Sequence, residues 1–114
     1  GAQPEAAQEV EKLEGKDKDF YIYAASSAYF SWYHNLKTVI SRDSAFHVIT
    51  NLEWKEGLGP LEIYNLFKRS NIKYVMDNIY RPQLKPFFDK IKSRPDLFEP
   101  IFQKDGISLW RLKL

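Results

Sequence analysis

The stretch FYIYA at residues 20–24 decides the fold, because it combines aromatic and β-branched side chains without the polar alternation of a half-exposed strand. A strand that is apolar on both faces needs helices on both sides of its sheet, as parallel α/β sheets provide. A second run of this kind, IKYVM at 72–76, precedes Asp77 and Asn78. Both runs are therefore predicted to be buried strands of a parallel sheet.

Apolar residues at helical spacing predict helices between and around these strands. The N-terminal helix ends at Gly15, and Ser26 or Ser27 can cap the next helix. Pro60 and Pro82 each suit the first position of a later helix, where the missing N–H has no partner to lose. The predicted helices cover residues 4–14, 28–33, 60–69 and 82–91.

The position of the second strand is open between two segments. KTVI at 37–40 and FHVIT at 46–50 both carry the β-branched residues typical of a strand. We favour 46–50, which would place Thr50 and Asn51 at the end of that strand.

The last part of the chain has a different pattern. Two strand-like runs, 98–102 and 107–112, flank the dipeptide Asp105-Gly106, which suits the positive φ angles of a tight hairpin turn. Alternate residues of the second run face opposite sides, and both sets include apolar side chains. An antiparallel hairpin that closes the sheet is therefore expected.

These elements predict an α/β fold, specifically a three-layer Rossmann-like sandwich with a mostly parallel sheet closed by the C-terminal hairpin. The sheet should hold about four to five strands. The chain has 114 residues, enough for one hydrophobic core. We expect a single domain over 1–114, with the N-terminal helix in 1–15, a βαβαβα core in 16–97 and the hairpin in 98–114.

Composition excludes several classes of function. Seventeen basic and fifteen acidic residues alternate in sign along the chain, which argues against nucleic acid as a partner. No stretch approaches the roughly 20 apolar residues of a membrane span. The chain has no cysteine, so thiol catalysis and cysteine–zinc sites are excluded. The start of the sequence also resembles a chosen boundary, and we expect the chain to be a piece of a larger protein.

No cofactor or metal site is predicted. His34 and His47 have no acidic or cysteine partner nearby in the sequence, so both are expected to be structural or surface residues. The first strand is followed by AASSA in place of a glycine-rich phosphate loop. Neither Ser26 nor Ser27 lies in a nucleophile motif. We therefore assign no catalytic residue.

One edge of the predicted sheet can assemble a binding site, because ligands of open parallel sheets lie beyond the carboxyl ends of the strands. Asp77 is the most interesting residue there, since a carboxylate at a strand end can act as a base or bind a hydroxyl. The Asp-Asn pair also initiates turns, and we favour that interpretation. The residues expected at this edge are Tyr23, Ser26, Thr50, Asn51, Asp77 and Asn78.

The three tryptophans could stack on sugar rings. Trp32 and Trp110 occupy predicted helix and strand positions, where aromatic side chains are more often part of the core. Trp54 lies in a polar segment, so it is the one we add to the candidate ligand-binding residues.

The order of segments resembles the C-terminal extracytoplasmic domain of polytopic membrane glycosyltransferases, the group with protein mannosyltransferase-like and aminoarabinose transferase-like members. The likeness covers most of the chain. Asn71 replaces the glycine usual before the family's Ile-Lys-Tyr-Val strand. The similar segments are 5–14, 20–30, 70–77, 94–102 and 106–112.

The resemblance implies an accessory domain without catalytic residues, outside the cytoplasm and tethered through an upstream membrane region of the same polypeptide. The intact protein would transfer a sugar from a polyprenyl-phosphate donor, and this domain could help to hold a glycan or lipid-linked acceptor. The family's acidic catalytic residue lies in a membrane-part loop that this sequence does not contain.

Two alternatives come from other classes of protein. The first is a free-standing α/β binding module for a small polar ligand, suggested by the strand-end residues around Asp77. The second is a small hydrolase that uses Ser26 or Asp77, which the lack of a histidine in a recognisable motif disfavours.

Overall fold

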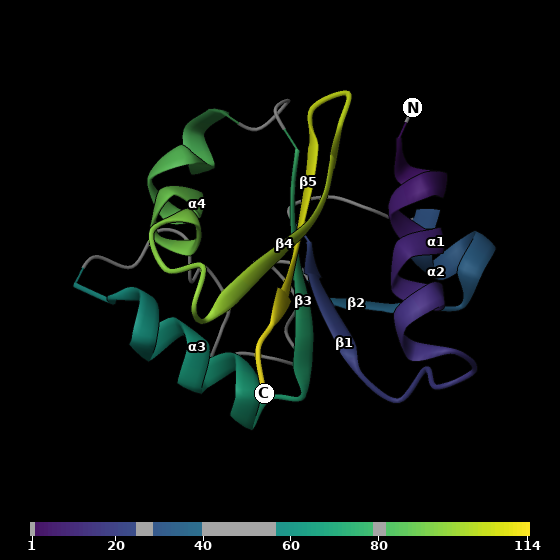
Figure 1. Ribbon diagram of the computed structural model, residues 1–114, viewed down its shortest axis with the longest axis horizontal. Helices are drawn as coiled ribbons and strands as arrows, with labels where there is room; N and C mark the ends of the chain where they lie inside the picture. Colours follow the sequence, from purple (N-terminus) through teal and green to yellow (C-terminus); the bar gives the residue numbers. More distant parts are fainter. Residues whose placement is uncertain (1, 25–28, 40–56, 79–81) are drawn as a thin grey trace.

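The computed structural model describes residues 2–24, 29–39, 57–78 and 82–114. Figure 1 shows the arrangement of the helices and strands. In chain order the elements are α1 (Gln3–Glu14), β1 (Tyr21–Ala24), α2 (Tyr29–His34), β2 (Lys37–Val39), α3 (Pro60–Arg69), β3 (Ile72–Asn78), a 3₁₀ helix (Pro82–Leu84), α4 (Lys85–Lys92), β4 (Phe98–Lys104) and β5 (Ile107–Leu112).

The described strands form one five-stranded sheet in the order β2-β1-β3-β5-β4. β1 is parallel to both β2 and β3, whereas β5 is antiparallel to both β3 and β4. The expectation of a mostly parallel sheet is therefore wrong, and the sheet is mixed. The physical reason is that the C-terminal hairpin contributes two of the strands and joins the sheet through β5, beside β3.

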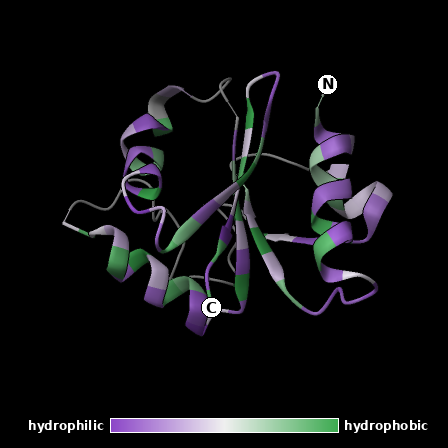
Figure 2. Cartoon of the chain, in the orientation of Figure 1, coloured by the Kyte–Doolittle hydropathy of each residue, from purple (hydrophilic) through white to green (hydrophobic). Residues whose placement is uncertain are grey.

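Helices cover both faces of the sheet, as the apolar strands require (Figure 1). α1 and α2 pack on one face, and α3 and α4 pack on the other. Figure 2 shows that hydrophobic and hydrophilic residues share helices α1, α3 and α4, as in amphipathic helices. The α/β class and the helix layers on both faces are thus confirmed.

Strand β1 supplies side chains to both cores, which confirms that it is buried on both faces. Tyr23 packs with the α3–α4 core, and Ile22 packs with the α1–α2 core. Ala24 of β1 and Phe20, directly before the strand, are also fully buried. Alternate residues of a strand point to opposite faces, so one short apolar run anchors both helix layers.

The second strand differs from the sequence-based choice. It is β2, Lys37–Val39, paired with β1 at the sheet edge. The favoured segment, 46–50, lies outside the described residues. The edge position explains the difficulty, because β2 contacts one neighbouring strand and only Val39 of its three residues is buried. Such a strand has little apolar signal.

The hairpin is confirmed. Asp105 and Gly106 have φ angles of 50° and 82°, the left-handed values that the Asp-Gly pair predicted. Leu109 belongs to the α1–α2 core, whereas Trp110 belongs to the α3–α4 core. The hairpin therefore carries apolar side chains into both halves of the interior.

Helix α2 differs from expectation in its packing. Phe30 is the residue of this six-residue helix that is fully buried. Trp32 was expected to be a core residue, but it is 78% exposed, and the neighbouring Tyr33 is 70% exposed. A short helix has one side facing the sheet, so Trp32, two positions beyond Phe30, turns outward. Tyr33, three positions beyond Phe30, packs its ring against the Tyr29 ring at a centroid distance of 4.9 Å.

Candidate functional site

The carboxyl ends of β1 and β3 meet at a topological switch point. β1 lies between β2 and β3. The chain therefore runs from β1 to β2 on one side of β1 and then crosses to β3 on its other side. Ala24, the last residue of β1, pairs with Met76, and β3 continues for two more residues, Asp77 and Asn78. Ligands of open α/β sheets bind at such a point.

Two of the predicted site residues have described side chains at this edge. Asp77 is partly exposed and pairs in the ladder with Ser108 of β5. Tyr23 is 1% exposed, and its ring lies 5.0 Å from the Phe67 ring. Tyr23 therefore belongs to the core beneath the edge, while Asp77 lies at its surface.

The other predicted site residues cannot be placed at atomic detail. Asn78 is the last residue of β3, but its side chain is not among the described parts of the structure. The remaining candidates fall in segments outside the described residues. These are Ser26, Thr50, Asn51 and Trp54, together with Ser27 and His47.

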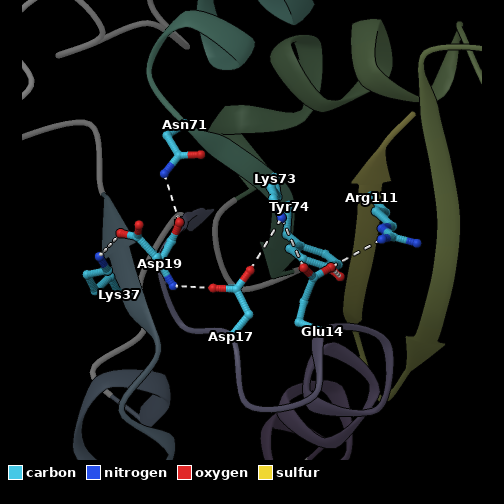
Figure 3. Close-up of polar contacts among 8 residues, drawn as sticks. All are labelled: Glu14, Asp17, Asp19, Lys37, Asn71, Lys73, Tyr74 and Arg111. Atoms are coloured by element: carbon cyan, nitrogen blue, oxygen red, sulfur yellow. Dashed lines mark hydrogen bonds and ion pairs between the residues drawn. The ribbon is translucent and has the colours of Figure 1, made fainter. Parts of the chain in front are cut away.

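A polar network at the opposite, amino edge of the sheet was not found from the sequence (Figure 3). Its centre is Glu14, the last residue of α1, whose side chain is 6% exposed. Its carboxylate accepts hydrogen bonds from the Tyr74 hydroxyl at 2.5 Å, Lys73 Nζ at 3.1 Å and Arg111 at 3.2 Å. The network ties α1 to strands β3 and β5.

Electrostatics hold this network in one charge state. Burial by itself would raise the pKa of Glu14, but hydrogen bonds from Tyr74 and Lys73 and the charges of Lys73 and Arg111 together lower that pKa. Burial, followed by the hydrogen bond to Glu14, raises the pKa of Tyr74. The carboxylate stays ionised and the phenol stays protonated, so the pair is suited to structure and not to proton transfer.

No local signal could have revealed this network. Glu14 lies 59 residues before Lys73 and 97 before Arg111. Only the packing of α1 across the two strands brings these side chains together.

The turn after α1 carries further charges. Asp17 lies 3.7 Å from Lys73, and its carboxylate also accepts a hydrogen bond from the Asp19 N–H (Figure 3). Asp19 in turn forms an ion pair with Lys37 at 3.3 Å. An open hollow of about 450 Å³ lies over this turn. Its lining residues are polar and mostly exposed, as on a solvated surface.

His34 contacts the carboxylate of Glu11, which lies far from it in the sequence. Its Nδ1 lies 2.8 Å from a carboxylate oxygen of Glu11, and Lys18 donates to the other oxygen of that carboxylate at 2.9 Å. The hydrogen bond from Lys18 is the main cause that lowers the pKa of Glu11. His34 thus has an acidic partner in space, although Glu11 lies 23 residues before it in the chain.

A second hollow, of about 570 Å³, borders the sheet edge at β4. Pro100 and Trp110, which pair across the hairpin, are among its apolar lining residues, and Gln103, Ser108 and Lys92 supply polar groups. Proline suits an edge strand, because it has no N–H to offer a neighbouring strand.

Within ranges 2–24, 29–39, 57–78 and 82–114, no group of three or more acidic, histidine or cysteine side chains could hold a metal ion. In the same ranges no helix has the length and apolar character to cross a membrane.

Comparisons with protein-family models, with curated proteins and with solved structures find no match to this chain.

Proposed function

We propose that this chain is an extracytoplasmic accessory domain of a membrane glycosyltransferase, whose membrane part transfers a sugar from a polyprenyl-phosphate donor. In this proposal the domain has no catalytic residue, packs over the membrane part of the same polypeptide and helps to hold the glycan or lipid-linked acceptor.

The backbone of Asn71 is the observation that carries this proposal. Asn71 stands where the family resemblance has a glycine, directly before β3, and its φ is 58°. Glycine adopts this left-handed conformation freely, and asparagine is among the few other residues that tolerate it. The asparagine that replaces the family's glycine at position 71 is therefore compatible with the left-handed backbone conformation found there.

The Asn71 side chain also helps to hold this turn. Its Nδ2 donates to the carbonyl oxygen of Asp19 at 2.9 Å (Figure 3). The Tyr21 N–H donates to the Asn71 carbonyl oxygen. These bonds join the starts of β1 and β3. The segments that carry the resemblance thus meet in adjacent strands of the sheet.

The proposal can be tested on the full natural polypeptide. We expect it to partition into membranes and, in detergent or nanodiscs, to transfer labelled sugar from a polyprenyl-phosphate sugar. Removal of residues 2–114 should lower transfer to the natural acceptor. A full natural polypeptide without membrane helices would refute the proposal.

A second function is favoured by the position of Asp77 at the switch point. A partly exposed carboxylate beyond the end of β1 can accept hydrogen bonds from a small polyol or sugar. Binding of such a ligand to the isolated chain should then weaken in Asp77→Ala. Saturable binding with unchanged affinity in that variant would remove Asp77 from the site.

A further inference from the structure

The start of α1 lies at the same end of the molecule as the carboxyl ends of β1 and β3. Asn78 at the end of β3 pairs with Ile107, and Ile107 pairs with Lys104 across the hairpin. Lys104 Nζ then lies 2.9 Å from both carboxylate oxygens of Glu5, in the first turn of α1. Figure 1 shows the N-terminus beside the hairpin turn and the C-terminus at the opposite end.

Helix α1 is held along its whole length, so its direction is set by the sheet. Ala6, Ala7 and Val10 are fully buried against the sheet face. The Glu5–Lys104 pair ties its start, and the Glu14 network ties its end. A chain that enters the domain through α1 therefore meets it in one fixed orientation.

From this geometry we infer that the end of the domain with the hairpin turn and the carboxyl edge faces the membrane part of the same polypeptide. This inference rests on the proposed function, in which the chain arrives from a membrane region through α1. Asp77 and the switch point then open toward the membrane surface, where a lipid-linked acceptor would be presented. The Lys16–Asp19 turn, at the amino edge, faces away.

Depth measurements on the full natural polypeptide in nanodiscs test this orientation. A fluorophore is placed on a single cysteine, introduced as Gln103→Cys beside the hairpin turn or as Lys16→Cys at the amino edge. Both positions are exposed, and the described chain supplies no competing cysteine. Gln103 lies near the hairpin turn and Lys16 lies in the turn at the amino edge, so the two probes report on opposite ends of the domain.

Quenching by spin-labelled lipid headgroups should be several-fold stronger for the Gln103→Cys probe than for the Lys16→Cys probe. Equal quenching, or stronger quenching at Lys16→Cys, would overturn the orientation while leaving the glycosyltransferase proposal in place. A polypeptide that does not insert into nanodiscs would refute the proposed function and with it this inference. Thermal melts of both unlabelled variants should match the parent, which confirms that the probes report on the native fold.

Discussion

The two ends of the central sheet use charged residues differently. At the amino edge Glu14 is almost fully buried, and three donors from β3 and β5 surround its carboxylate. At the carboxyl edge Asp77 remains partly exposed at the switch point between parallel strands. A buried carboxylate with three donors stabilises packing, whereas a partly exposed carboxylate near a strand end is accessible to a ligand.

The largest expected effect comes from Tyr74→Asp, which breaks the amino edge. Tyr74 is fully buried and donates to Glu14, so an aspartate there would face another carboxylate without its donor. The expected destabilisation is about 4 kcal/mol or more, comparable to the total stability of a small domain. Circular dichroism at about 25 °C should show an unfolded chain.

Tyr74→Phe is the matched control for this substitution. It keeps the ring in the core and removes one hydrogen bond to a charged acceptor, which costs about 1.5–3 kcal/mol. A folded Tyr74→Phe variant beside an unfolded Tyr74→Asp variant would assign the effect to the charge. Cooperative melting of Tyr74→Asp at the parental temperature would show that the strand placement is wrong.

Glu14→Gln should have an intermediate effect. The amide oxygen can still accept from Tyr74, but the attraction to Lys73 and Arg111 is lost. Those two cations are 39% and 33% exposed, so water partly replaces the lost partner. We expect a loss of about 1–3 kcal/mol in urea unfolding. An unchanged unfolding midpoint would mean that α1 does not depend on this network.

The same network predicts a difference in acid stability. The pKa of Glu14 is lower in the folded chain than its usual value of 4.5, so its contribution is fully present above about pH 4.5 and is lost as the pH falls through the folded pKa. Urea midpoints measured from about pH 6 to about pH 3 should therefore fall more steeply for the parent than for Glu14→Gln. Parallel curves would contradict this assignment.

The smallest stability effect is expected for Asp77→Asn at the carboxyl edge. The substitution keeps the size and most hydrogen-bonding capacity of a partly exposed side chain, so the free energy of unfolding should change by about 0.5 kcal/mol or less. Its effect should appear in ligand binding, measured by calorimetry. A loss of stability as large as that of Glu14→Gln would make Asp77 a structural residue and erase the contrast between the two edges.

Local patterns predicted most elements correctly, because the signals lie within a few residues of one another. The apolar run at 20–24, the proline at the start of α3 and the Asp-Gly turn each define their element locally. β2 was misassigned because an edge strand of three residues has little apolar content. Trp32 was placed in the core because an aromatic side chain is usually buried. In the structure α2 buries Phe30 against the sheet, and Trp32 is exposed.

The candidate site divides in the same way. Asp77 could be named in advance, because it comes directly after the apolar run 72–76, and β3 ends one residue later at Asn78. The Glu14 network could not, because its members lie far apart in the chain and only the crossing of α1 over β3 and β5 joins them.

By itself, the sequence determined the α/β class, the hairpin and the burial of β1 on both faces, since periodicity and turn chemistry act over short distances. Only the tertiary structure decided the mixed sheet, the edge position of β2 and the direction in which α1 enters the domain. Those features depend on which strands pair and which charges meet across the fold, and no window of neighbouring residues contains that information.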